Sequence, residues 1–314
     1  MAPKKHLWDF ISEAKLIIKA HLRHFNILSL TFLFPLSLSL FLSSTLSHLF
    51  NYFFTNNSPT LLPPPQTTNP TFSLLYSLLL LLFSNCGVIT ITYSVFHFFH
   101  DQPVNLLSAI KSIGTSFLPL LATTIVSQLI FFFISLFYGL LLLLLIHGAK
   151  LLPLPLLPSS SPYIIGFFIA LPLIVVQTYL EVNWTLVNAI VVVESCWGME
   201  ALRRSARLIK GMKGVALSSI FFYGFCAVIL TWNYFFLTRG YNVSTESGFP
   251  AVLNWEMIVL GSYFLSMIML SKIAVTTLLY IYCKANNHVE IAEDFGKDYG
   301  SLLPSHDGDV SQVV

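Results

Sequence analysis

Charged residues are scarce in this sequence: Asp, Glu, Lys and Arg make up only 10% of its 314 residues, whereas 55% are hydrophobic. Soluble domains carry about 25% charged residues, because their surfaces have to meet water. A soluble protein of this composition would lack the polar side chains to cover its apolar ones, and a protein facing lipid needs no such cover. The composition therefore predicts an integral membrane protein. The net charge of +2 is too small to indicate a nucleic-acid partner.

Motifs for catalysis and metal binding are also absent from the sequence. It contains no G-x-S-x-G, P-loop, H-E-x-x-H or Rossmann fingerprint. No two of its cysteines have the C-x-x-C spacing of metal sites or share a short exterior loop: Cys86, Cys196, Cys226 and Cys283. We therefore expect no disulfide framework, no metal site and no cofactor, and we expect the protein not to be an enzyme.

Six long apolar runs are present instead. A helix needs about 20 apolar residues to cross the hydrocarbon core of a bilayer. The first run is longer than the apolar part of a signal peptide, so we interpret it as a retained span. The six runs cover residues 27–50, 72–99, 115–147, 163–182, 215–238 and 257–283. They predict an all-α fold, a polytopic membrane helical bundle of about six transmembrane helices with interfacial amphipathic helices beside them.

Three regions follow from this pattern. Residues 1–26 are predicted to form a cytoplasmic amphipathic interfacial helix, and residues 27–283 to form the six-span membrane domain. Residues 284–314 are rich in Asp and Glu and poor in large apolar side chains. Such a segment buries too little apolar surface to offset the entropy of ordering. We therefore expect it to be an acidic, flexible cytoplasmic tail.

The basic residues predict the orientation, because Lys and Arg favour the cytoplasmic side of a membrane. If both termini are cytoplasmic, the exterior loops contain only Lys150 and Arg239, and Lys272 lies within the last span. All other basic residues then fall in cytoplasmic segments: Lys4, Lys5, Lys15, Lys19, Arg23, Lys111, Arg203, Arg204, Arg207, Lys210, Lys213, Lys284 and Lys297. We expect this topology, in the endoplasmic reticulum, another endomembrane or the plasma membrane.

Two glycosylation patterns agree with this orientation. Asn56 and Asn242 each begin an N-x-[ST] sequence, the acceptor pattern for N-linked glycosylation. Both lie in loops that the basic residues place outside the cell or in a lumen, where that modification occurs. Asn56 and Asn242 are therefore candidate glycosylation sites.

The segment before the first run is amphipathic at helical spacing. Leu7, Ile11 and Ala14 follow a three-or-four step, and Lys15 and Lys19 share another face. One interpretation is an interfacial helix attracted to anionic lipid at the cytoplasmic face. The alternative is a helix that packs on the bundle and only sets the topology.

A second amphipathic segment begins at Met199. Glu200 precedes Arg204 by four residues, a spacing at which the two side chains can pair on a helix. The apolar residues share one side and the basic residues another: Met199, Leu202, Ala206 and Ile209, then Arg203, Arg207 and Lys210. We expect a cytoplasmic helix that lies in the membrane surface.

A few polar residues interrupt the apolar runs and form a candidate intramembrane site. Gln177, Glu181 and Asn188 fall at steps that place them on one face of a continuous helix, together with Trp184. A carboxylate in hydrocarbon costs about 2.5–3.5 kcal/mol, so Glu181 needs a partner, a proton or an interfacial position. Lys272 is expected to reach the cytoplasmic interface or to pair with Glu181. The structural and the ligand-binding interpretations both stay open.

Residues 183–214 carry a resemblance to known proteins. They read N-W-x-L-x-x-A-I-V-V-V-E and then G-x-x-A-L-R-R-S-x-x-L-I-K-G. This pattern resembles an uncharacterised plant family of six-span membrane proteins, and it is distantly similar to the membrane domain attached to some bacterial glycerophosphodiester phosphodiesterases. The resemblance implies a shared helical fold. It implies no catalysis, because the soluble phosphodiesterase domain has no counterpart in this sequence.

Two functions are consistent with these features. The first is a non-enzymatic role in organising the membrane, handling lipid or serving as a scaffold, with membrane lipids as partners and proteins bound through cytoplasmic segments. The alternative is a small transporter or channel with a polar site around Glu181. A hydrated cavity lined by the polar residues would favour transport, and a closed bundle with a lateral apolar groove would favour lipid handling.

Overall fold

The computed structural model describes residues 6–43, 70–151, 161–241 and 249–302, and within these ranges the chain forms helices and no strand. Six helical segments in the described part are long and apolar enough to cross a membrane. The predicted all-α polytopic membrane bundle is therefore confirmed. Asn56 and Asn242 lie outside the described residues.

The helices follow the predicted runs closely, with differences at their ends. The run 72–99 corresponds to one uninterrupted helix, and the run 257–283 lies within a helix that continues to Leu302, well past the expected start of the tail. The elements in chain order are α1 (Leu7–Ala20), α2 (Leu22–Leu28), the π-helix η1 (Ser29–Leu33), α3 (Phe34–Phe41), α5 (Pro70–Phe99), α6 (Leu106–Leu151), α7 (Ser161–Trp184), α8 (Val187–Glu194), α9 (Met199–Leu208), the 3₁₀-helix η2 (Ile209–Gly211), α10 (Lys213–Tyr241) and α11 (Phe249–Leu302).

The first span contains a π-helical turn just before a proline. Pro35 has no N–H, and its ring crowds the carbonyl four residues earlier, which belongs to Thr31. The wider turn of η1 accommodates this ring, and the Thr31 hydroxyl donates a 2.7 Å hydrogen bond to the Ile27 carbonyl. The span therefore continues as a helix through Pro35 into α3.

Close packing at Gly87 holds this first span against α5. A Cβ atom at Gly87 would lie 2.9 Å from Leu33 Cδ2 and 3.4 Å from Phe32 Cβ. We expect Gly87→Leu to lower the free energy of unfolding by about 1–3 kcal/mol, because the added side chain has to displace these neighbours. Thermal unfolding in detergent measures the effect. Gly114→Leu on α6 is the matched control, since nothing lies within 4 Å there, and equal losses for both variants would contradict the packing.

Helix α1 packs on the bundle and keeps its basic face free. Phe10 is fully buried and meets the ring of Tyr282 edge to face, with the centroids 5.3 Å apart. The Tyr282 hydroxyl also donates a 2.8 Å hydrogen bond to Glu13. Lys15 and Lys19 remain exposed. Helix α1 thus packs on the bundle, as one of the two interpretations of this segment requires. The attraction of its exposed basic face to anionic lipid stays a prediction.

Helix α9 buries a face shifted from the predicted one. Its buried residues are Ala201, Leu202 and Ser205, followed by Ile209 at the start of η2, whereas Met199 is 48% exposed. The Ser205 hydroxyl donates a 2.7 Å hydrogen bond to the carbonyl of Asn183 at the end of α7. This bond joins the buried face of α9 to α7.

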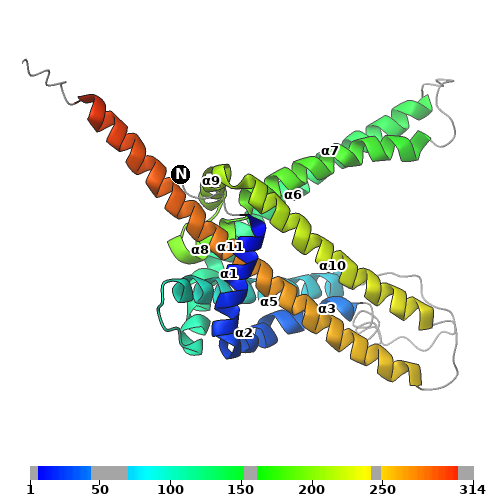
Figure 1. Cartoon of the computed structure of the whole chain (residues 1–314). Coiled ribbons are helices and arrows are strands. Elements are labelled where there is room, and N and C mark those ends of the chain that lie inside the picture. Colours follow the sequence, from blue (N-terminus) through cyan, green and yellow to red (C-terminus); the bar gives the residue numbers. More distant parts are fainter. Residues whose placement is uncertain (1–5, 44–69, 152–160, 242–248, 303–314) are drawn as a thin grey trace, which may run out of the picture.

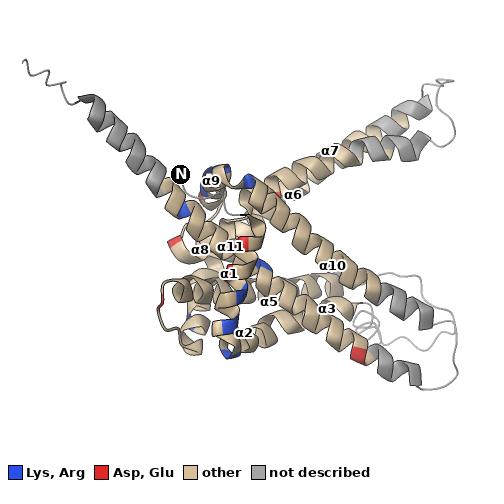
Figure 2. Ribbon diagram, in the orientation of Figure 1, with Lys and Arg blue, Asp and Glu red and all other residues tan. Residues whose placement is uncertain are grey.

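Two hairpins diverge from a common root. Figure 1 shows that α6 and α7 form one hairpin, α10 and the first half of α11 form another, and the two run apart from the region of α1, α8 and α9. Phe132, Phe133 and Phe137 on α6 and Phe225 on α10 are each more than half exposed. Side chains of this kind face lipid. Lys and Arg gather at the root, on α1, α2, α9 and the start of α10 (Figure 2).

Candidate functional site

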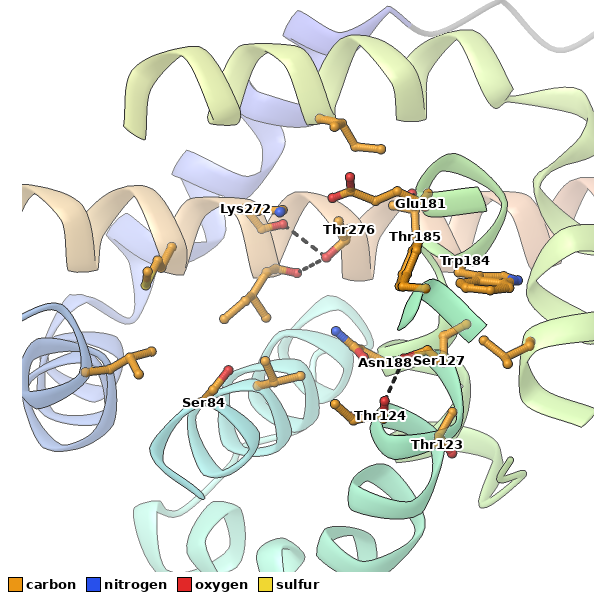
Figure 3. A pocket seen from close by; sticks show the side chains of 18 of the residues that line it. Ser84, Thr123, Thr124, Ser127, Glu181, Trp184, Thr185, Asn188, Lys272 and Thr276 are labelled. Carbon is orange, nitrogen blue, oxygen red and sulfur yellow. Dashed lines mark hydrogen bonds between the residues drawn. The ribbon is translucent and has the colours of Figure 1, made fainter. Parts of the chain in front are cut away.

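A cavity of about 340 Å³ lies at the root of the two hairpins. Its wall comes from η1, α3, α5, α6, α7, α8, α9, α10 and α11, so it sits where nearly all the spans meet. The polar residues that line it are Ser84, Thr123, Thr124, Ser127, Glu181, Thr185, Asn188, Lys272 and Thr276 (Figure 3). The structure thus brings three of the four predicted polar residues to one cavity.

Glu181 and Lys272 approach this cavity from different helices, Glu181 from the end of α7 and Lys272 from the middle of α11 (Figure 3). Both side chains are exposed to the cavity. The structure shows no ion pair or side-chain hydrogen bond for either charged group within the described part of the chain. An acid and a base therefore face one open space without neutralising each other.

Asn188 reaches the cavity through a break in the helix. The spacing would align Gln177 and Asn188 on one face of a continuous helix, but α7 ends at Trp184 and α8 begins at Val187. The Thr185 hydroxyl donates a 2.8 Å hydrogen bond to the Glu181 carbonyl, and the Thr185 amide bonds the Val182 carbonyl in a tighter turn. The break redirects the chain while Glu181 and Asn188 still face the same space.

Gln177 does not line the cavity. Its side-chain amide donates a 3.0 Å hydrogen bond to the Ser135 hydroxyl on α6. Glutamine and serine paired in this way hold two neighbouring helices together in a lipid environment. Gln177 is therefore placed to join α6 to α7.

Thr123 connects the cavity wall to the loop before α9. Its hydroxyl donates a 2.7 Å hydrogen bond to the Pro119 carbonyl and accepts a 2.8 Å bond from the Gly198 amide. The loop needs two left-handed residues, Ser195 with φ 55° and Gly198 with φ 67°. Glycine adopts this conformation without strain, whereas serine does so less readily. The Thr123 bond thus helps to fix a turn that the sequence alone does not determine.

A second polar cluster lies beside the cavity, centred on Glu194. Its Oε2 atom is 2.6 Å from Arg204 Nε, and its Oε1 atom is 2.8 Å from Lys284 Nζ. The Tyr280 hydroxyl donates a 2.8 Å hydrogen bond to Oε1. The Glu194 side chain is only 9% exposed. One carboxylate therefore joins α8, α9 and α11.

The sequence did not predict this cluster. The helical spacing had favoured a pair between Glu200 and Arg204, and in the structure Arg204 contacts Glu194 instead. The one local signal was an acid that ends the apolar run of α8, where a buried charge requires a partner. Lys284 lies ninety residues further along the chain, and no local rule connects the two.

Metal-binding clusters are not found among the described residues. No group of three or more His, Cys, Asp or Glu side chains in that part of the chain converges on a common point. The four cysteines are free thiols, with Cys86 and Cys283 buried and Cys196 and Cys226 half-buried.

The six spanning helices and the cavity at their root define an integral membrane protein of the helical, multi-pass class. Residues 6–299 match a family described as a domain of unknown function, DUF8558, and the chain belongs to that family. No curated protein and no solved structure matches the chain significantly. The resemblance to plant six-span proteins and to the membrane domain of bacterial phosphodiesterases stays a prediction.

Proposed function

We propose that this protein is a non-enzymatic, lipid-handling membrane protein that holds a zwitterionic headgroup in the cavity at the root of the hairpins. The observation that carries the proposal is the placement of Glu181 and Lys272, which face one cavity with opposite charges and no mutual ion pair. A ligand that carries an ammonium and a phosphate complements both side chains at once.

The energetics of charge favour such a ligand. A charged side chain within the hydrocarbon costs about 2.5–3.5 kcal/mol on insertion scales, so acids and bases in spans mark functional sites. Glu181 and Lys272 would offset this cost most simply by pairing with each other, and they do not. The Ser and Thr hydroxyls and the Asn188 amide add neutral donors and acceptors around the pair.

The surroundings of the cavity favour an amphiphile over a wholly polar ligand. Tyr179, two residues before Glu181, packs against the ammonium of Lys213, whose Nζ lies 5.3 Å from the ring centroid. Tyr and Lys together are typical of the boundary between lipid and water. Beyond Tyr179 and Lys213 the hairpins expose Ile174, Val175 and Phe225, apolar side chains suited to contact with lipid. A headgroup in the cavity would thus leave its acyl chains beside apolar helices.

A second candidate is a transporter of a small zwitterionic solute. A cavity lined by Glu181, Asn188 and Lys272 is what we expected of a transporter, and that observation favours this candidate too. The two candidates differ in whether acyl chains contribute to binding. Binding of a headgroup without acyl chains therefore distinguishes the two candidate functions.

Native mass spectrometry of the full chain in detergent tests the proposal. The ligands are short-chain phosphatidylethanolamine, short-chain phosphatidylglycerol, diacylglycerol and free glycerophosphoethanolamine. We expect the zwitterionic lipid to bind at least about tenfold more tightly than the other two lipids, because only it satisfies both charges. Equal affinity for free glycerophosphoethanolamine would favour the transporter. Equal affinity for all three lipids would reject a zwitterionic site.

We further propose that both termini are cytoplasmic, in an endomembrane or the plasma membrane, because nearly all Lys and Arg residues then lie on that side. Acceptor sites for glycosylation placed at each terminus should stay unmodified. An acceptor in the loop at residues 240–250 should be modified. A modified terminus, or an unmodified loop at adequate distance from the bilayer, would contradict this topology.

A further inference from the structure

A second cavity lies at the elbow where α1 turns into the first span. It has a volume of about 570 Å³ and shares no residue with the cavity at the root of the hairpins. It is lined by Lys19, His21, Arg23 and His24, by Phe98 at the end of α5 and by Pro103 after that helix. Four basic residues from six consecutive positions therefore line one hollow.

The elbow itself explains this convergence. α1 ends at Ala20 and α2 begins at Leu22, and His21 between them has φ −121° and ψ 40°, outside the helical region. A continuous helix would spread residues 19–24 around its circumference, about 100° apart. The break instead lets side chains from both helices reach the same side of the chain.

Two of the four basic side chains are held in place. The His21 ring stacks on Phe98, with the centroids 3.8 Å apart and the planes 10° apart. His24 Nε2 lies 2.9 Å from the Ser94 hydroxyl. Ammonium and guanidinium groups donate hydrogen bonds to phosphate oxygens, whereas the one N–H of a neutral His24 ring goes to the Ser94 hydroxyl, whose own proton goes to the Thr90 carbonyl. Part of this hollow is thus rigid before any ligand arrives.

The charge of the hollow is of one sign. None of the described residues that line it is acidic, and Lys19 and Arg23 form no ion pair within the described part of the chain. The cavity around Glu181 and Lys272 differs, because it contains charges of both signs. The elbow lies at the start of the first candidate span, Leu22–Phe41, and lipid headgroups attract basic residues at the ends of spans.

We propose that the elbow hollow binds a phospholipid headgroup that carries phosphomonoesters, as in a phosphorylated phosphatidylinositol. Several phosphates on one ring match several donors in one hollow, whereas a headgroup with a single diester engages fewer of them. Arg23 and Lys19 supply the charge, and the two histidines position the ring. This site is separate from the proposed zwitterionic site, and each can exist without the other.

Binding to the full chain in detergent at physiological salt tests the assignment. The ligands are short-chain phosphatidylinositol bisphosphate, short-chain phosphatidylserine and free inositol trisphosphate. The variants are Arg23→Glu in the hollow and Lys15→Glu on the exposed face of α1, which lies outside the hollow and reverses the same charge. Arg23→Gln gives the same comparison if Arg23→Glu lowers the melting temperature of the unliganded protein.

We expect the bisphosphate lipid to bind at least about tenfold more tightly than phosphatidylserine. Arg23→Glu should remove this preference. Lys15→Glu should change the affinity for the bisphosphate lipid less than about twofold. Equal weakening by both variants, or equal affinity for phosphatidylserine, would show only diffuse attraction to negative charge and overturn the site. Equally tight binding of free inositol trisphosphate would overturn the assignment to a lipid.

Discussion

Replacing Glu194 with alanine is expected to lower the free energy of unfolding by about 2–3 kcal/mol. The side chain is 9% exposed and accepts contacts from Arg204, Lys284 and Tyr280. Its loss leaves Arg204 and Lys284 close together without their counter-ion. It also removes the side-chain contacts that connect α8 to α9 and α11. Breaking a fully buried pair costs more, but both cations here are partly exposed to solvent, which reduces the penalty.

Thermal unfolding in one detergent, followed by tryptophan fluorescence, measures this effect. Glu200→Ala is the matched control, because Glu200 is an exposed acid beside the same arginine and pairs with nothing in the described structure. Tyr280→Phe should cost about 1 kcal/mol, since it removes one hydrogen bond and leaves both ion pairs. A larger loss for Glu200→Ala than for Glu194→Ala would show that the cluster is assigned to the wrong acid.

Lys272→Met is expected to weaken binding of the zwitterionic lipid by about tenfold or more, and Glu181→Gln should do the same. A hydrogen bond to a charged group contributes about 1.5–3 kcal/mol, which corresponds to roughly ten- to hundredfold in affinity. Neither variant should lower the melting temperature of the unliganded protein, because neither charged group is paired within the described part of the chain. Lys111→Met, at an exposed position of α6 away from the cavity, is the control.

The two interpretations of Glu181 give opposite results in these experiments. If Glu181 only supports the fold, Glu181→Gln keeps its affinity for lipid, and Glu181→Leu lowers the melting temperature by leaving partners unsatisfied. If Glu181 binds the headgroup, Glu181→Gln loses affinity while its melting temperature stays that of the wild type. The open position of the carboxylate in the cavity favours the second outcome.

The spans could be predicted from the sequence because the bilayer imposes a minimum length on each apolar run. The run 72–99 differs from α5 by only two residues at its start. The extension of α11 to Leu302 was missed, because its polar residues resemble those of a flexible segment. The part of α11 after residue 283 lacks the long apolar run by which the spans were identified.

The candidate site was only partly predictable. Glu181 and Asn188 are close in sequence, so helical spacing placed them together even though the helix breaks between them. The approach of Lys272 depends on how α11 packs against α8 and α5, and one sequence does not contain that information. The Glu194 cluster was missed for the same reason, since its partners come from α9 and α11.

The occupant of the cavity can be located directly by photo-cross-linking. The full chain in lipid nanodiscs would receive a phosphatidylethanolamine whose photoactivatable group lies next to the headgroup, and peptide mass spectrometry would map the modified residues. We predict that the modified residues fall within 181–188 and 272–276, on opposite walls of the cavity, and that excess unlabelled phosphatidylethanolamine suppresses them. Modification confined to the outer face of α10, at Phe221 and Phe225, would contradict a headgroup site at the root of the hairpins.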